Sequence, residues 1–287
     1  SGGAAAQIQK TMLVISPKPG ILLGSPNENI GYSVALSGGI QQDDPSIGVK
    51  SLFTDPKGYT WSFTVGTKVD LEPPKILNVY PSPSSKDNYT NAILTVNFSK
   101  PMMPSTILDS TNSGLQVLGK DGVKIDGTWN LANLASSAEF RPNNPCGKSA
   151  CGDQFYCLPS NSTVTLHAVP AVIDATRGTP KAILGGLGLM SLNQNSFDGN
   201  GNGTAEGPTI DTADSSFDVG SKLDIEGPGI TAHTPGINGS FVDALGTLSM
   251  TFNEPILMSS MGSIALLQPT GLAQYYYPSA KDLDGSG

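Results

Sequence analysis

The stretch FTVGTKVDLEPPKI at residues 63–76 returns as FDVGSKLDIEGPGI at residues 217–230, 154 positions later. The same spacing holds without a gap as far as residues 105 and 259. The residues that recur unchanged at this spacing are Phe63, Val65, Gly66, Lys68, Asp70, Glu72, Pro74, Ile76, Pro81, Leu94, Phe98, Pro101 and Ser105. A period of this length is that of a whole folding unit rather than of a short solenoid repeat. The sequence therefore predicts a tandem array of like domains.

The repeat divides the 287 residues into one complete unit and two partial ones. Residues 71–224 are expected to form the complete unit. Residues 1–70 are then the C-terminal part of a preceding unit, and residues 225–287 the N-terminal part of a third. Two interpretations stay open: the partial units of different copies complete one another head to tail, or the chain is a window from a longer array. An open sheet edge and an uncovered core would drive the first.

Composition favours strands and excludes some partners. Glycine and proline are frequent (34 and 22 residues), only 14% of residues are charged, and 38% are hydrophobic, which suffices for a packed core. The net charge of −8 disfavours binding to nucleic acid or to an anionic membrane surface. No apolar run of about 18 residues exists, so no membrane insertion is expected. Ser1 begins no recognisable signal peptide, as in a processed product or an excised fragment.

Hydrophobic and polar residues alternate in several short stretches, which is the pattern of half-buried strands. These stretches are residues 32–36, 60–65, 93–98, 163–168, 216–219 and 248–252. Clusters of Pro, Gly, Asn and Asp separate them, as turns would. The pattern predicts an all-β, antiparallel two-sheet sandwich, with Trp61 buried in its strand. Prolines after Asp70 and Asp224 predict short, stiff connectors between units.

Three motifs resemble the bacterial Ig-like domain of the surface-layer-protein type. They are PPKI at 73–76 followed by VYP at 79–81, LTVNFSKPM at 94–102, and the closing WSFTV at 61–65. The third unit carries the central motif again as TFNEPI at 251–256. The resemblance implies tandem Ig-like β-sandwich domains that act as non-catalytic spacers in secreted or surface proteins. Residues 141–157 and 175–215 look like insertions into this pattern.

Three cysteines, Cys146, Cys151 and Cys157, lie within one short segment. A zinc site normally needs four ligands, and His167 and His233 have no ligand spacing relative to these thiols. A disulfide with one thiol left over is the better interpretation, and it implies an oxidising compartment. Either Cys146 or Cys151 could pair with Cys157.

A calcium site is predicted in the loop that starts at Asp198, where oxygen-bearing side chains alternate with glycines as in the first half of an EF-hand loop. Its expected ligands are Asp198, Asn200, Asn202 and Glu206. The twelfth position of the loop is Thr209 rather than a glutamate, so a plain Gly/Asn turn remains the alternative. A second place for calcium is at the predicted joints, where Asp70 with Glu72, and Asp224 with Glu226, stand beside prolines.

No catalytic residues are predicted. Neither histidine lies near a nucleophile elbow, and no carboxylate pair stands out from the 24 acidic residues. The sequence thus favours an extracellular or cell-surface structural protein of a filament, surface layer or adhesin stalk, which contacts copies of itself or neighbouring Ig-like domains. Two alternatives remain: an adhesin whose loops at 141–157 and 175–215 bind a glycan or protein ligand, with Phe155 and Tyr156 as its adjacent aromatic pair, and the spacer region of a larger secreted enzyme.

Overall fold

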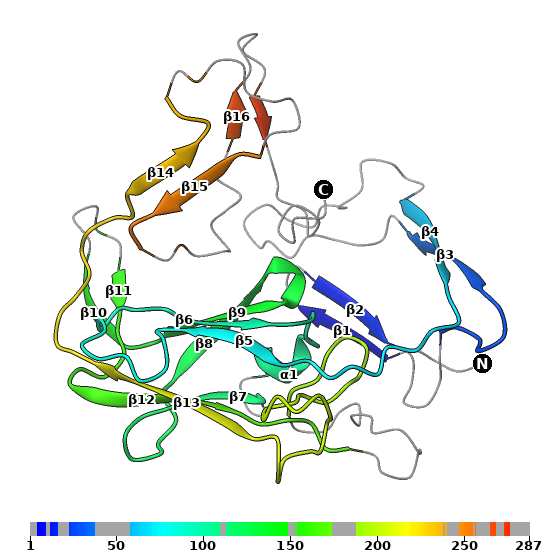
Figure 1. Ribbon diagram of the computed structural model, residues 1–287, viewed down its shortest axis with the longest axis horizontal. Helices are drawn as coiled ribbons and strands as arrows, with labels where there is room; N and C mark the ends of the chain where they lie inside the picture. Colours follow the sequence, from blue (N-terminus) through cyan, green and yellow to red (C-terminus); the bar gives the residue numbers. More distant parts are fainter. Residues whose placement is uncertain are drawn as a thin grey trace.

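The computed structural model describes residues 5–9, 12–16, 23–37, 58–109, 113–148, 152, 154–173, 188–237, 239, 247–254, 256, 265–267 and 273–275 (Figure 1). Its elements are β1 (Ala5–Gln9), β2 (Met12–Ser16), β3 (Ile30–Leu36), β4 (Tyr59–Val65), β5 (Ile76–Tyr80), β6 (Leu94–Phe98), α1 (Ser105–Leu108), β7 (Leu115–Leu118), β8 (Gly127–Ala132), the 3-10 helix η1 (Asn133–Ala135), β9 (Ser137–Pro142), β10 (Pro145–Lys148), β11 (Gln154–Tyr156), β12 (Ser162–Ala168), β13 (Ala213–Val219), β14 (Ile230–Thr234), β15 (Ser249–Phe252), β16 (Ala265–Leu267) and β17 (Ala273–Tyr275). The predicted all-β class is confirmed, and each stretch predicted as a strand lies on one. The ends agree to within a residue, except that β3 begins two residues and β13 three residues before the predicted start.

Two antiparallel sheets make up the middle of the molecule, and we call elements β5 to β13 the central body. One sheet has four strands in the order β5-β6-β9-β8, and the other has three in the order β13-β12-β7. Figure 1 shows these sheets as two layers. The hairpin β10–β11 forms a separate two-stranded sheet at one end of the body.

One hydrophobic core joins the two sheets. It contains Leu94, Val96 and Phe98 from β6 together with Val164 and Leu166 from β12. Side chains at every second position of β6 point into this core, whereas Thr95 and Asn97 between them are half-buried. Strand alternation places one face of each sheet inside, which is why the period-two pattern of the sequence marks the core.

Part of the predicted insertion at 175–215 also belongs to this core. Leu189 and Phe197 are buried in it, although they lie in a loop. Backbone hydrogen bonds join Leu189 to Val169 and Phe197 to Leu189. The described part of the insertion therefore covers the end of the sandwich. Residues 174–187 lie outside the described part.

An irregular segment, residues 84–90, runs along the outer edge of β13. It is parallel to that strand, with a bridge between Asn88 and Val219. Five backbone hydrogen bonds connect the segment with residues 216–222. Asn91 continues the contact, because its side chain accepts from the Asp224 amide at 2.8 Å and donates to the Asp224 carbonyl at 2.7 Å. The connector that leaves β13 is thereby fixed to the central body.

The β14–β15 hairpin repeats the β5–β6 hairpin at the spacing of 154 residues. Ile76 pairs with Phe98, and Ile230 pairs with Phe252. In both hairpins the register then shifts by one residue before pairing resumes at Asn78 and Ala232. The β3–β4 hairpin matches β12–β13 in the same way, with Val65 and Val219 at the corresponding ends.

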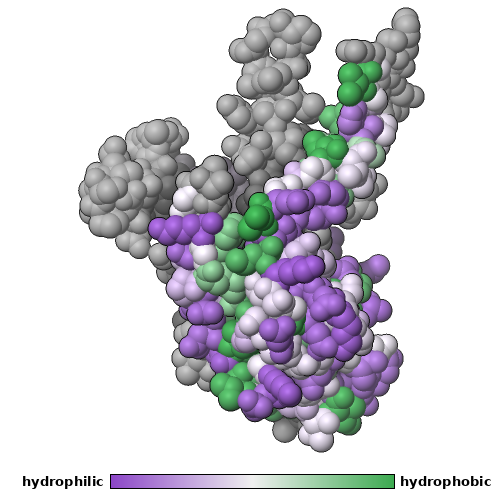
Figure 2. Space-filling view, turned by 90° about the vertical axis from the view of Figure 1, so that its left-hand side faces the viewer, coloured by the Kyte–Doolittle hydropathy of each residue, from purple (hydrophilic) through white to green (hydrophobic). Residues whose placement is uncertain are grey.

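Burial differs sharply between these matching hairpins. Leu94 is fully buried in the central body, whereas its counterpart Leu248 is 56% exposed. Phe217 is 2% exposed, and its counterpart Phe63 is 40% exposed. The prediction that Trp61 is buried is wrong. Its side chain is exposed on the β3–β4 hairpin, because no described sheet covers that hairpin. Figure 2 shows hydrophobic residues continuing from the central body onto its projecting part.

Candidate functional site

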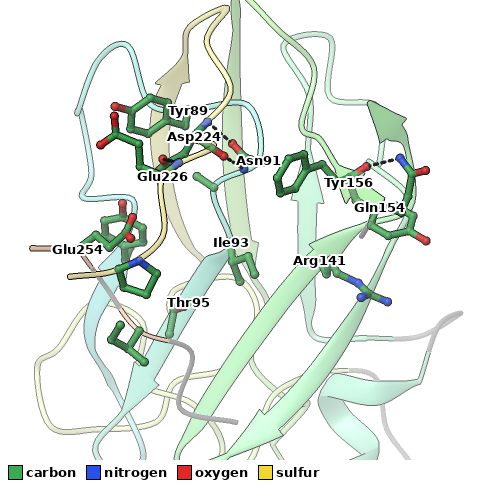
Figure 3. Close-up of a pocket in the computed structure, with 15 residues that line it drawn as sticks. Tyr89, Asn91, Ile93, Thr95, Arg141, Gln154, Tyr156, Asp224, Glu226 and Glu254 are labelled. Atoms are coloured by element: carbon green, nitrogen blue, oxygen red, sulfur yellow. Dashed lines mark hydrogen bonds between the residues drawn. The ribbon is translucent and has the colours of Figure 1, made fainter. Parts of the chain in front are cut away.

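A cleft of about 460 Å³ lies at the end of the central body where the connector leaves β13 (Figure 3). Ile93 and Thr95, at the start of β6, lie between its two sides. The residues that line it are Tyr80, Tyr89, Asn91, Ala92, Ile93, Thr95, Arg141, Gln154, Phe155, Tyr156, Asp224, Glu226, Pro228, Glu254 and Ile256. One side of the cleft is aromatic and basic, and the other is acidic.

The β10–β11 hairpin forms the aromatic side. Phe155 and Tyr156 both line the cleft, and the Arg141 guanidinium lies over the Tyr156 ring at 4.9 Å from its centroid. A cation over an aromatic face is attracted to the ring, so this contact orients both side chains. Phe155 and Tyr156, the aromatic pair noted in the sequence, thus line the cleft. Nothing in the sequence indicated that Arg141 contacts Tyr156.

A disulfide fixes this hairpin. Cys146 in β10 is bonded to Cys157, directly after β11, with 5.8 Å between their Cα atoms. The predicted disulfide is confirmed, and of the two pairings left open the structure has Cys146–Cys157. Cys157 is buried, and its amide donates to the Asn144 carbonyl at 2.8 Å. Cys151, the other candidate partner of Cys157, lies outside the described residues.

Three carboxylates form the acidic side: Asp224, Glu226 and Glu254. Burial raises the pKa of Glu254, and the neighbouring carboxyl of Asp224 and the charge of Glu226 raise it further. Burial likewise raises the pKa of Tyr80, with added contributions from Asp224 and Glu254. The carboxyl oxygen Oε1 of Glu254 is buried and has no hydrogen-bond partner. Negative charge is therefore concentrated on this side, and none of the ion pairs between described residues includes these three carboxylates.

The joint before β5 is built from matching residues but has a different charge balance. Lys100 Nζ lies 2.7 Å from Asp70 Oδ1, 3.2 Å from Glu72 Oε2 and 3.0 Å from the Glu72 carbonyl. Burial alone would raise the pKa of Asp70, but hydrogen bonds from Lys100 and Asn193 outweigh it and hold the pKa below its usual value of 3.8. Burial would lower the pKa of Lys100, and its bonds to Asp70 and Glu72 raise it instead.

Because the folded-state pKa of Asp70 is depressed, its contact with Lys100 stabilises the fold above pH 3.8 and loses this effect as pH falls through the folded-state pKa. We expect Lys100→Gln to move the pKa of Asp70 upward and to weaken the acid dependence of stability. An NMR titration of the Asp70 carboxyl carbon measures the first effect. Lys86→Gln removes an exposed ion pair with Asp218 and should leave Asp70 unchanged. An unmoved Asp70 titration in Lys100→Gln would contradict the assignment.

The loop predicted to bind calcium is held by its own hydrogen bonds. Asp198 is buried, and its two carboxylate oxygens accept from the amides of Gly201 and Gly203, both at 2.7 Å. The side-chain amides of Asn200 and Asn202 donate to Glu206 Oε2 at 3.0 and 2.8 Å. The four predicted ligands are thus brought into one loop, although their oxygens already accept hydrogen bonds.

Asp211 completes this loop and was not singled out in the sequence. It is fully buried, and one of its oxygens accepts from the amides of Glu206 and Gly207 while the other has no partner. Burial raises the pKa of Asp211, and the charges of Asp198 and Glu206 add to the effect. Within the described ranges, no three His, Cys, Asp or Glu side chains already surround a common point. Calcium at this loop stays a prediction.

The two histidines lie on strands. His167 in β12 faces Asp214 in β13, with 2.7 Å between Nδ1 and Oδ1. His233 in β14 has its Nδ1 at 2.7 Å from the carbonyl of Pro235. The first is a contact between two neighbouring strands and the second lies within one turn. The prediction that the chain has no catalytic site stays a prediction.

Comparisons with known proteins give a distant likeness among solved structures. No protein-family model matches the chain, and no curated protein matches it. Among solved structures, domains 1–6 of the surface layer protein SbsC match 55% of this chain at 14% identity and a TM-score of 0.27. The match spans 15% of the SbsC chain. A TM-score this low does not establish a shared fold.

In the described part of the chain, no helix is both long and apolar enough to cross a membrane.

Proposed function

We propose that this chain is a non-catalytic structural protein of the cell surface, built from Ig-like modules in tandem, with residues 71–224 as its complete module. The observation that carries the proposal is the contrast between matching hairpins. Leu94 is buried under the second sheet of the central body, while Leu248, its counterpart in the repeat and the residue directly before β15, is 56% exposed. An apolar strand face of this kind needs a partner sheet.

Strand order supports an Ig-like module. In a constant-type Ig domain the first, second, fifth and fourth strands form one sheet, and the third, sixth and seventh form the other. With β10–β11 set aside as an inserted hairpin, β5, β6, β9 and β8 take the first set of positions. The strands β7, β12 and β13 take the second set. The repeated registers of β14–β15 and β3–β4 support further modules on either side.

A cell-surface location is supported by the Cys146–Cys157 disulfide, because such bonds persist in oxidising compartments. The two hairpins outside the central body, β3–β4 and β14–β15, support self-association. In the central body, β5–β6 and β12–β13 contribute to one core. The exposed faces of β14–β15 and β3–β4 are the corresponding halves, so β14–β15 of one copy can complete β3–β4 of the next. Repeated head to tail, this contact does not close and builds a filament or layer.

Self-association is tested by light scattering at increasing concentration and by electron microscopy of the purified chain. We expect concentration-dependent assemblies whose formation is abolished by Leu248→Lys, since a charge in the contact would be buried without a partner. Val123→Lys is the matched control, because Val123 is 68% exposed but lies on a loop of the central body. Monodisperse particles at every concentration would reject self-complementation and leave the outer hairpins to be covered by adjoining sequence.

The cleft supports a second candidate function, binding of a glycan or protein ligand. Phe155, Tyr156 and Arg141 present aromatic and basic groups opposite three carboxylates. Aromatic walls with a few placed polar groups are typical of binding sites. Particles that stay single and retain a ligand through this cleft would favour the adhesin alternative.

A further inference from the structure

The outer edge of β13 in the central body is covered by another backbone. Residues 84–90 run parallel to this edge and form five backbone hydrogen bonds with it. The carbonyls of Ser216, Asp218 and Lys222 accept three of these bonds, and the amides of Asp218 and Gly220 donate the other two. An uncovered strand edge is a row of unpaired donors and acceptors that can pair with another chain. In the central body, residues 84–90 satisfy those groups.

Gly220 allows the two backbones to approach closely. Its amide donates to the Asn88 carbonyl at 2.8 Å. A Cβ atom at this position would lie 3.3 Å from the Cα of Asp87 and 3.5 Å from the Asn88 carbonyl oxygen, so even a methyl group would crowd the segment. A glycine in a strand often marks a place where another backbone passes, and here the structure shows that backbone.

The matching strand β4 presents the same kind of edge to solvent. It pairs with β3 over seven residues that end at Val65, as β13 pairs with β12 over seven residues that end at Val219. Among the described strands, β3 is its only partner. The repeat counterparts of the four edge residues of β13 are all exposed, and they are Ser62, Thr64, Gly66 and Lys68.

Gly66 indicates that this edge is also used by a second backbone. It is the repeat counterpart of Gly220. Within the described part of the chain, the nearest atom to a Cβ at Gly66 is the side-chain oxygen of Asn29, at 3.9 Å. Neither glycine has a positive φ, so backbone conformation does not demand glycine at either position. Gly66 therefore leaves room for a backbone that comes from elsewhere.

We propose that the outer edge of β4 binds the backbone of residues 238–244 of a second copy of this chain, parallel to β4. These residues lie 154 positions after residues 84–90, so they correspond to the segment that covers β13. The pairing would repeat the five hydrogen bonds of β13 in the same register. Addition of a segment to a sheet edge takes its affinity from such main-chain bonds. This inference rests on the proposed self-association and adds an edge contact to the contact between apolar faces.

The partner is a second copy because the two parts are separated within one molecule. Figure 1 shows β3–β4 and β14–β15 on different sides of the central body. In the central body, residues 84–90 lie between β5 and β6 and cover β13 of the same module. Residues 238–244 likewise lie between β14 and β15 in the sequence. A second copy that places its β14–β15 hairpin on β3–β4 therefore brings these residues to β4.

The edge contact is tested with Thr64→Pro and its matched control, Thr64→Val. Proline removes the amide that would donate to the second copy, and strand edges that face solvent tolerate proline. Valine keeps the amide and suits a strand. In light scattering at increasing concentration, Thr64→Pro should raise the concentration needed for assembly about tenfold, the effect of losing one hydrogen bond. Its melting temperature should stay that of the unmutated chain, and Thr64→Val should assemble normally.

The two glycines supply a second pair of variants. Gly66→Val should weaken assembly, because its side chain would meet the backbone of the second copy, and it should leave the melting temperature unchanged. Gly220→Val should instead lower the melting temperature, because residues 84–90 already cover that position. A loss of melting temperature in Gly66→Val equal to that in Gly220→Val would show that β4 is covered within one molecule, and it would overturn the proposal.

The outcomes separate the edge contact from the self-association on which it rests. If Leu248→Lys abolishes assembly but Thr64→Pro and Gly66→Val assemble as the unmutated chain does, the edge contact is wrong and the apolar contact stands. Single particles of the unmutated chain at every concentration would overturn both. A synthetic peptide of residues 235–246 should inhibit assembly, and a peptide of the same residues in scrambled order should not. Failure of the first peptide to inhibit would exclude residues 238–244 as the occupant.

Discussion

Replacing Phe217 by alanine should lower the free energy of unfolding by about 3–5 kcal/mol. The side chain is 2% exposed and lies on β13 within the core that joins the two sheets. Truncation removes its contacts with both sheets and leaves a cavity that close-packed neighbours fill only in part. Thermal unfolding followed by circular dichroism should show the melting temperature falling by roughly 10 °C.

The repeat supplies a matched control residue, Phe63. Phe63 occupies the matching position on β4, but it is 40% exposed and stacks on Tyr32 with their ring centroids 5.6 Å apart. Phe63→Ala should cost about 1 kcal/mol or less in the isolated chain. If a neighbouring copy covers β3–β4, the same substitution should instead weaken assembly. Equal losses of stability from Phe217→Ala and Phe63→Ala would contradict the placement of the core in the central body.

Loss of the disulfide has the second largest expected effect. The double variant Cys146→Ala and Cys157→Ala should be about 2–3 kcal/mol less stable, because the unfolded chain is no longer constrained by the loop that the bond closes. Both residues are replaced together so that Cys151 cannot form a substitute bond. Chemical denaturation gives the difference, and reduction of the unmutated chain should reproduce it.

This variant also probes the cleft. Phe155 and Tyr156 stand on the hairpin that the disulfide fixes, so the aromatic wall should lose its order when the bond is absent. Cys151→Ser, by comparison, should change neither stability nor the cleft. The pairing would be refuted by peptide mapping that finds Cys151 bonded in place of Cys146, or by a double variant as stable as the parent.

Much of the fold could be predicted because strand alternation and turn residues are local signals. Leu94, Val96 and Phe98 alternate with polar residues, and the structure buries these three. Trp61 shows the limit of such local signals. Its strand has the same pattern, but burial depends on a covering sheet, and no described sheet covers that hairpin. Periodicity identifies a face that can be buried and does not identify what buries it.

The candidate sites were predicted only in part. Asp70 and Asp224 could be predicted as joint residues because they are identical in the two copies of the repeat. Lys100 and Glu254 differ between the copies, so a comparison based on identical residues does not detect them. These two residues occupy the same position in the repeat but carry opposite charges. The effect of this difference on the joints can be recognised only when the structure shows that β6 and β15 match. The burial of Asp211 depends on how its loop folds back on the body, and the contact of Arg141 with Tyr156 depends on where the β10–β11 hairpin lies. Such long-range contacts leave no periodic pattern in the sequence.

The parallel segment along β13 determines how tension would pass through the central body. Load applied through residue 74 and residue 225 pulls residues 84–90 and β13 in opposite directions along their common axis. The five backbone hydrogen bonds between them lie side by side across that axis, and the two bonds from Asn91 to Asp224 hold the point where the chain exits. Separation of the two segments therefore requires sliding, in which these bonds share the load, rather than peeling, in which they yield singly. A module arranged in this way resists stretching more strongly than its modest number of contacts suggests.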